Sequence, residues 1–158
     1  MTHASTVLAI ATLTTAMIAG FLVSYCVTLG GWFTHMTGSG RARTAQEYYT
    51  PFRVASHLKQ RYGAWMLLQP LLAIFSLILN ARSQPLAPQI ALLLPLPLLL
   101  LIHSWSGFGK IEEDFASGKE LSGEQEARYA QLNLPLHRLY ALFYIIAAVW
   151  LILAVGIA

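Results

Sequence analysis

Four stretches of the chain carry no charged side chain. Residues 1–40, 62–81, 83–109 and 139–158 contain no Asp, Glu, Lys or Arg. A helix needs about 20 mostly apolar residues to cross the roughly 30 Å hydrocarbon core of a bilayer, and each stretch is long enough. Since a spanning segment must satisfy its backbone hydrogen bonds internally, all four are predicted to be helices. We expect spans at about residues 7–29, 62–79, 88–108 and 136–155 of a single membrane domain, residues 1–158.

The composition agrees with this pattern. Hydrophobic residues make up 56% of the chain and charged residues 11%, whereas an average soluble domain is about 25% charged. The chain has one cysteine, which excludes a secreted disulfide-stabilised domain. The net charge of +3 includes no run of basic residues, so no nucleic acid partner is expected. The predicted fold class is therefore all-α: an integral membrane four-helix bundle whose main surroundings are the lipid bilayer.

The first span could be mistaken for a cleavable signal peptide. No Lys or Arg precedes it, and its apolar stretch is longer than the core of a signal peptide. We therefore expect this segment to be retained as a membrane span.

The positive charges gather on one side of the predicted spans. The first connection carries Arg41, Arg43, Arg53, Lys59 and Arg61, and the third carries Lys110, Lys119 and Arg128, with Arg138 at its end. Arg82 alone lies in the second connection, so nine of ten positive charges share a side. Because Lys and Arg favour the cytoplasmic side, both termini are predicted to be non-cytoplasmic. The membrane is taken to be a bacterial inner membrane.

The two charged connections are predicted to contain short interfacial helices. Thr44 and Glu47 have the spacing of a capping box, and Pro51 is expected to separate a short helix from one that runs into span two. Ser122 and Gln125 have the same spacing at the start of a helix that leads into span four.

Proline and small residues predict how the spans pack. Pro95 and Pro97 remove amide donors from span three and should bend it, and Pro135 is a further candidate kink at the start of span four. Span one has a small residue at every fourth position, which favours close helix packing, either within one protomer or in a dimer. This stripe consists of Thr12, Ala16, Gly20, Ser24 and Thr28.

Polar side chains recur near the cytoplasmic ends of three spans. Residues that share a face by helical spacing are His57, Arg61, Trp65 and Gln69 at span two, His103, Ser106, Lys110 and Glu113 at span three, and Asn133, His137, Tyr140 and Tyr144 at span four. Ionisable groups within spans usually face the bundle interior or a water-filled cavity. The sequence therefore predicts a polar pocket shared by these faces.

The predicted pocket suggests roles for its side chains. His137 or His103 can act as a general base, because imidazole titrates near neutral pH, and Asn133 completes the predicted catalytic set by stabilising an oxyanion. The predicted substrate-binding residues are Arg61, Trp65, Tyr140, Tyr144, Arg138, His57 and Glu113. Glu113 is chosen among the three consecutive acids 112–114 because it shares the His103 face. The alternative is that the histidines bond to neighbours and that Arg61 and Arg138 reach lipid phosphates.

No metal site is assigned. His103 and His137 on consecutive spans can be imagined as haem or metal ligands. However, the chain has no HExxH pattern, no Glu-x-x-His on these spans and no cysteine cluster. The cofactor is therefore left unknown.

The start of span four, residues 129–138 (YAQLNLPLHR), follows a polar loop and contains an aromatic residue, an Asn and a basic residue. In this and in its four-span topology the chain resembles the anthrone-oxygenase-like group of small membrane proteins. The resemblance implies oxidation of a flat, lipophilic aromatic molecule without an obvious tightly bound cofactor. It carries functional roles over to Asn133, His137 and Arg138.

Two functions compete at this point. One is an oxidoreductase or oxygenase that acts on a lipophilic aromatic or quinone-like molecule. The other is a non-catalytic accessory or structural subunit of a larger membrane complex, with the chain as a homo-oligomer or as one of several subunits. A transporter ranks third, because no span carries an acidic residue at mid-depth.

Overall fold

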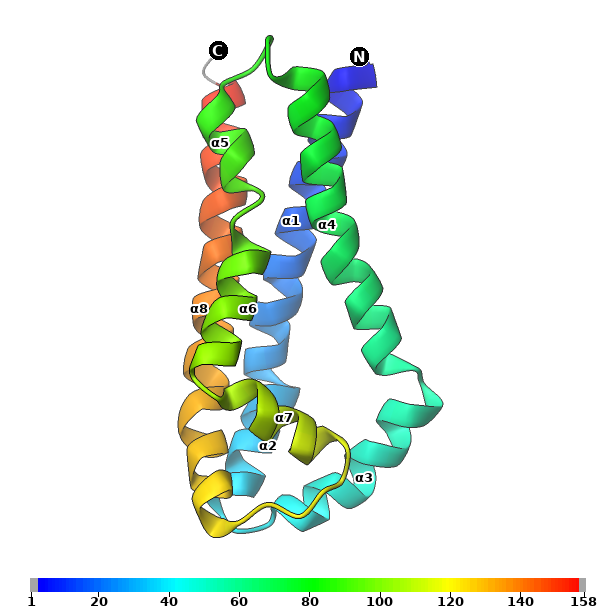
Figure 1. Ribbon diagram of the computed structural model, residues 1–158, viewed down its shortest axis with the longest axis vertical. Coiled ribbons are helices and arrows are strands. Elements are labelled where there is room, and N and C mark those ends of the chain that lie inside the picture. The colour runs from blue at the N-terminus through cyan, green and yellow to red at the C-terminus, as the bar shows by residue number, and fades with distance from the viewer. Residues whose placement is uncertain (1–2, 157–158) are drawn as a thin grey trace.

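The computed structural model describes residues 3–156, and every regular element in that range is a helix (Figure 1). In chain order the helices are α1 (His3–Val27), α2 (Leu29–Gly38), α3 (Ala42–Ala55), α4 (Leu58–Asn80), α5 (Leu86–Ala91), α6 (Pro95–Trp105), α7 (Phe108–Ala116) and α8 (Gly123–Gly156). The helical segments long and apolar enough to cross a membrane are His3–Gly38, Leu58–Asn80, Leu86–Trp105 and Gly123–Gly156. The chain is thus an all-α integral membrane protein with four candidate spans, as predicted.

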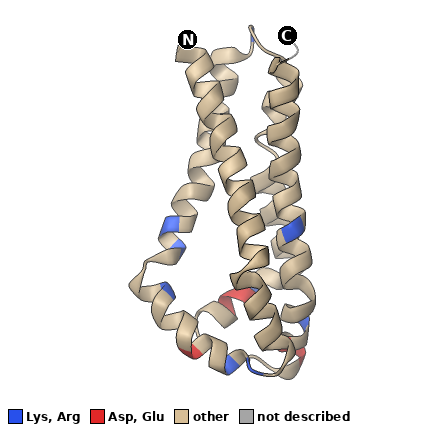
Figure 2. Ribbon diagram, turned by 180° about the vertical axis from the view of Figure 1, so that it is seen from behind, with Lys and Arg blue, Asp and Glu red and all other residues tan. Residues whose placement is uncertain are grey.

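The spans run along the long axis of the molecule, and both described ends of the chain lie together (Figure 1). Helices α2, α3 and α7 lie at the opposite end. Figure 2 shows that most Lys, Arg, Asp and Glu residues lie there as well, and we call this region the charged end. The other region, where the chain begins and ends, is the terminal end.

Helices α1 and α8 form the centre of the bundle. Both bury alanines in shared hydrophobic clusters, among them Ala11 and Ala19 from α1 and Ala141 and Ala147 from α8. Small side chains let helices approach closely where lipid provides no hydrophobic drive for association.

The small-residue stripe predicted on span one faces away from the bundle. Ala16, Gly20, Ser24 and Thr28 are exposed, so this stripe does not pack within the protomer. The neighbouring face of α1, which contains Ala11 and Ala19, makes the internal contacts instead.

Helix α4 stays close to the bundle near the terminal end and moves away from it toward the charged end (Figure 1). The buried Gln69 amide fastens its middle, donating to Thr15 Oγ1 and to the Leu92 carbonyl, both at 2.9 Å. The Leu92 carbonyl is available because span three is interrupted between α5 and α6. Pro95 begins α6 and supplies no amide donor to the preceding turn, as the proline pattern predicts.

Helix boundaries near the charged end differ from prediction in two places. Helix α3 begins at Ala42, so Thr44 is not its cap, and it continues through Pro51. The chain breaks instead at His57, whose φ of 51° is left-handed. Because α3 lies at the polar end, water can satisfy the carbonyl that loses its donor at Pro51.

The start of α8 was predicted correctly. The Ser122 amide donates to Gln125 Oε1 at 2.9 Å, and the Gln125 amide donates to Ser122 Oγ at 3.3 Å, forming the expected capping box. From there α8 continues as one helix through Pro135.

Candidate functional site

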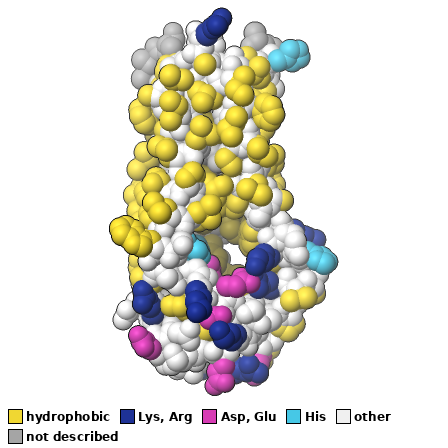
Figure 3. Space-filling model, in the orientation of Figure 1, with side chains coloured by type: hydrophobic (Ala, Val, Ile, Leu, Met, Phe, Trp, Pro, Cys, Tyr) yellow, Lys and Arg dark blue, Asp and Glu magenta, His cyan; other side chains and the backbone are white. Residues whose placement is uncertain are grey.

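A cavity of about 800 Å³ lies where α4 leaves the bundle. Figure 3 shows a hollow on this face, where the apolar spans meet the charged end. Apolar side chains from α1, α4 and α6 form much of the wall: Met17, Ile18, Phe21, Leu22, Met66, Leu96, Leu99 and Leu100. The polar lining residues come mainly from α3, α7, α8 and the ends of α4 and α6. The cavity is therefore apolar along the spans and polar at the charged end.

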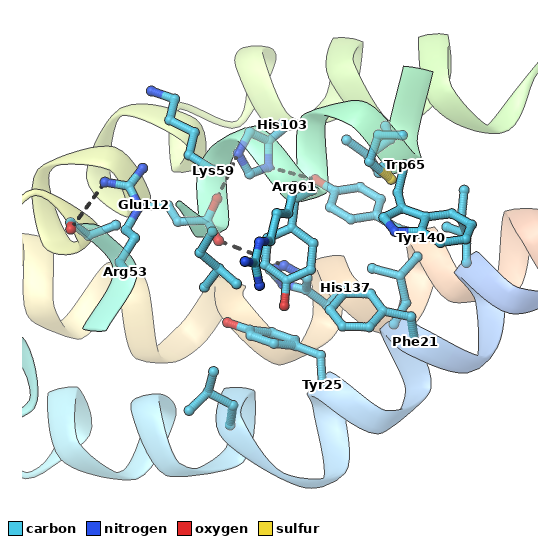
Figure 4. A pocket seen from close by; sticks show the side chains of 18 of the residues that line it. Phe21, Tyr25, Arg53, Lys59, Arg61, Trp65, His103, Glu112, His137 and Tyr140 are labelled. Carbon is cyan, nitrogen blue, oxygen red and sulfur yellow. Dashed lines mark hydrogen bonds and ion pairs between the residues drawn. The ribbon is translucent and has the colours of Figure 1, made fainter. Parts of the chain in front are cut away.

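Two histidines and one glutamate form the centre of the polar part (Figure 4). His103 Nε2 lies 3.1 Å from Glu112 Oε2, and His137 Nε2 lies 3.7 Å from Glu112 Oε1. All three side chains line the cavity. One carboxylate thus faces two imidazoles from different spans.

Hydrogen bonding determines the protonation pattern of the two imidazoles. His137 Nδ1 lies 2.8 Å from the main-chain carbonyl oxygen of Asn133, which can only accept, so Nδ1 carries the proton. In neutral His137 the lone pair is then on Nε2, on the side of Glu112. His103 Nε2 can donate to the Glu112 carboxylate while Nδ1, 3.3 Å from the Tyr140 hydroxyl, accepts from it. His137 Nε2 is therefore a basic nitrogen that accepts no hydrogen bond from the described residues.

A helix break positions Glu112. Gly107, with a φ of 71°, ends the run from α6, and α7 begins at Phe108 in a new direction. Phe108 and Phe115 are buried, and Glu112 lies between them along the same face of α7. Gly109 permits α7 to pack closely against the His103 ring, because a Cβ at this position would lie 2.7 Å from His103 Cδ2.

Asn133 connects three helices behind the cavity. Its amide donates to the Gly30 carbonyl and to Thr34 Oγ1, both at 3.0 Å, and its Oδ1 accepts from the Tyr25 hydroxyl at 3.0 Å. The side chain is fully buried and does not line the cavity. The Tyr25 ring packs against the His137 ring with 4.4 Å between centroids. Asn133 therefore holds Tyr25 and His137 in place and has no group free for a ligand.

Ion pairs close one side of the cavity mouth. Glu113 accepts from Arg53 at 2.8 Å and from Lys59 at 2.9 Å, which links α7 to α3 and α4. Partial burial raises the pKa of Glu113, but the hydrogen bonds and charges of Lys59 and Arg53 outweigh burial and hold its pKa below the ordinary value. Glu113 is therefore ionised and committed to this pair of cations.

Tyr49 supplies a neutral hydroxyl to the cavity lining. Its ring packs between Phe33 and Phe115, with centroid distances of 4.7 and 6.3 Å. Burial raises the pKa of Tyr49 to about 12. The hydroxyl stays protonated at neutral pH and can donate to a ligand oxygen.

Five of the residues predicted for the site line this cavity: His103, His137, Arg61, Trp65 and Tyr140. The structure thus brings together both histidines and part of the predicted binding set.

The other five predicted residues do not line the cavity: Asn133, Tyr144, Arg138, His57 and Glu113. Asn133 uses its polar groups within the protein, and Tyr144 is fully buried in the core with no partner for its hydroxyl among the described residues. Arg138 is exposed on the outer face of α8. His57 is exposed at the break before α4, so the helical spacing from Arg61 does not extend back to it.

Glu113 is the most informative of the five, because Glu112 and not Glu113 faces the histidines. The spacing from His103 assumed one continuous helix, which Gly107 interrupts. Counted from the glycine instead, Glu112 is one turn after Phe108 and shares its apolar face. That spacing was the signal that could have identified Glu112. Tyr25 was missed as well, although it follows Leu22 by one turn on the buried face of α1.

The described residues form no assembled metal site around the two histidines. Within residues 3–156 no group of three or more His, Cys, Asp or Glu side chains is placed to hold a metal ion. Each ring nitrogen of His103 and His137 also faces a protein group, so ligation would have to displace one of these partners.

Comparison with known proteins adds no assignment: no protein-family model, curated protein or solved structure matches the chain. The function must therefore be argued from the chemistry of the cavity.

Proposed function

We propose that the protein is a membrane-embedded oxygenase that binds a lipophilic aromatic or quinone-like molecule in the cavity and removes a proton from it. The observation that carries the proposal is the position of Glu112 between two imidazoles at the polar end of an apolar cavity. Pockets for small molecules commonly measure about 300–1,000 Å³ and combine apolar walls with a few placed polar groups. This cavity has both properties.

The position of the cavity favours a substrate dissolved in the membrane. The lining residues Met66 on α4 and Leu99 on α6 belong to candidate spans, and α4 moves away from the bundle beside them (Figure 1). A flat apolar molecule from the lipid can lie along these apolar walls. Its reactive group would then meet the polar end.

His137 is the proposed general base. Its Nε2 lone pair takes the proton from an acidic C–H or O–H group of the substrate, and the Glu112 carboxylate stabilises the imidazolium that forms. The main-chain carbonyl of Asn133 holds the proton on His137 Nδ1, and the Asn133 side chain acts as a positioning residue because it holds Tyr25 against the His137 ring. The neutral Tyr49 hydroxyl donates to the oxygen on which negative charge develops.

Dioxygen is the proposed oxidant. A stabilised carbanion can transfer electrons to dioxygen, and a CH₂ group between aromatic rings then becomes a carbonyl. The sum is one CH₂ group and one dioxygen molecule giving one C=O group and one water. The predicted resemblance to the anthrone-oxygenase-like group implies this same class of reaction.

The proposed orientation places the charged end in the cytoplasm of a bacterial cell. Nine of the ten Lys and Arg residues lie at or beside the charged end, while Arg82 lies between α4 and α5 at the terminal end (Figure 2). Positive residues in short connections favour the cytoplasmic side.

A second candidate, a subunit of a homo-oligomer or of a larger membrane complex, is favoured by the outward-facing small residues of α1, Ala16, Gly20, Ser24 and Thr28. Such a face can pack closely against another helix. A subunit of this kind would be recovered as an assembly without turnover of its own.

Turnover of an aromatic probe tests the proposal. Purified protein in dodecyl maltoside is mixed with anthrone in air, and anthraquinone formation is followed by absorbance above the uncatalysed rate. His137→Ala should lower the rate about a hundredfold, as expected for loss of a general base. His35→Ala is the matched control, since His35 is exposed and lies outside the cavity lining. Equal rates for both variants and for the unmodified protein would remove His137 from the chemistry.

A further inference from the structure

The cavity mouth contains one cation that the protein does not neutralise. Three cations line the cavity, Arg53, Lys59 and Arg61. Glu113 pairs with the first two. The Arg61 guanidinium makes no hydrogen bond or ion pair with any side chain in residues 3–156. A guanidinium presents a planar set of donors that matches the geometry of a carboxylate or phosphate.

The surroundings of Arg61 resemble a binding surface. Trp65 follows it by one helical turn, also lines the cavity and is 47% exposed. Both side chains come from α4 and line the cavity together with Tyr25 and His137 (Figure 4). An indole face beside a guanidinium can hold the apolar body of a ligand next to its charged group.

The two ends of the polar lining differ in charge. Near the histidines the nearest charged group is the Glu112 carboxylate, which disfavours an anion there. Arg61 on the α4 side favours one. A ligand with one anionic group is therefore oriented, with its charge at Arg61 and its reactive part toward His137.

We propose that the ligand is an amphiphile with an oxyanion, a carboxylate or a phosphate, which Arg61 binds at the mouth while its apolar body lies in the cavity. This inference rests on the proposed function, because it names the substrate class of the same cavity. The oxyanion can belong to a small lipophilic acid or to a phospholipid headgroup.

A matched pair of aromatic probes tests the charge requirement. Anthracenecarboxylate and anthracenemethanol share one flat ring system and differ in the anion. Both absorb at tryptophan emission wavelengths, so binding beside Trp65 quenches its fluorescence in lipid-free dodecyl maltoside micelles. Trp65→Phe identifies the part of the signal that comes from this site, since the chain has three further tryptophans.

The unmodified protein should bind the carboxylate about tenfold more tightly than the alcohol, and Arg61→Gln should abolish that difference. Arg61→Lys should retain part of it, because the charge remains without the planar donor set. Arg82→Gln is the matched control for loss of one positive charge, since Arg82 is exposed and lies between α4 and α5 outside the cavity lining, and it should bind both probes like the unmodified protein.

A soluble short-chain phosphatidylglycerol distinguishes the sources of the oxyanion. If the phosphatidylglycerol displaces anthracenecarboxylate at a lower concentration than a non-fluorescent aromatic acid does, Arg61 binds a lipid phosphate. If the phosphatidylglycerol fails to compete, Arg61 binds the carboxylate of a small molecule. Both results support an oxyanion site at Arg61.

Equal binding of acid and alcohol by the unmodified protein, or an unchanged preference in Arg61→Gln, would overturn the inference. In that case the alcohol still reports on the cavity, so the proposed function survives if quenching at Trp65 persists. Absence of Trp65 quenching by both probes would count against both proposals.

Discussion

The two ends of the same bundle bury polar side chains in different ways. From its middle to the terminal end α4 stays against the bundle, and its buried amides bond to neighbouring backbone: Asn80 donates to the Ala4 carbonyl at 2.9 Å and Gln69 to that of Leu92. At the charged end α4 moves away, and His103, His137 and Glu112 face a cavity. Polar groups in membrane spans are thus not functional by their presence alone. They become candidates for chemistry where the packing leaves room for a ligand.

The largest expected effect separates two adjacent carboxylates. Glu112→Gln should lower anthrone turnover about a hundredfold, because a neutral amide cannot stabilise the imidazolium on His137. Glu113→Gln is the control, since Glu113 faces Arg53 and Lys59 outside the cavity lining. Initial rates at saturating substrate measure both. A greater loss in the Glu113 variant would show that the spacing from His103 was the better guide.

The next effect concerns folding rather than chemistry. Asn133→Ala removes three buried hydrogen bonds between α8 and the α1–α2 segment. At roughly 0.6 kcal/mol for each bond in a membrane protein, unfolding should become about 2 kcal/mol easier. Unfolding in mixed micelles, followed by circular dichroism, gives this free energy.

Tyr144→Phe is the matched control for Asn133→Ala. The Tyr144 hydroxyl is buried without a partner among the described residues, so its removal should not destabilise the protein. A loss of stability as large as that of Asn133→Ala would contradict this description of the Tyr144 hydroxyl.

A smaller effect tests the part of α4 that stays against the bundle. Gln69→Leu removes the bonds to Thr15 and Leu92, and the free energy of unfolding should fall by about 1 kcal/mol. Turnover per folded molecule should be unchanged, since Gln69 does not line the cavity. Reduced turnover with normal stability would contradict the division between the two ends.

The smallest effect is a dependence on pH. The folded protein lowers the pKa of Glu113, so its ionised form adds stability above the ordinary Glu value of about 4.3. That contribution is lost as pH falls through the lower folded value. With Glu113 51% exposed, solvent screening limits it to a few tenths of a kcal/mol. The free energies of unfolding of the unmodified protein and of Glu113→Gln should differ at neutral pH and become equal at acid pH.

The sequence predicted those features that depend on local composition and spacing. Apolar length identified the four spans, Ser122 and Gln125 identified the start of α8, and Pro95 identified the interruption in span three. Each is determined by residues close together in the chain.

Features that depend on backbone direction were not predictable in the same way. His57 adopts a left-handed conformation that is uncommon for a residue with a side chain, and Gly107 turns the chain so that Glu112 replaces Glu113. Helical spacing cannot be carried across either break. The sequence correctly placed Arg61 and Trp65 in a polar pocket, but it placed Tyr144 there as well, because helical spacing does not show which side chains the tertiary packing buries.

The central claim is that the histidine–glutamate group removes a proton from a molecule in the cavity. Hydrogen exchange without oxygen tests it most directly: anthrone is incubated with the protein in heavy water under argon, and loss of its CH₂ proton signal is followed by NMR. The account predicts exchange about a hundredfold faster than in buffer, and no acceleration with His137→Ala or Glu112→Gln. Exchange at the buffer rate with the unmodified protein would contradict the account.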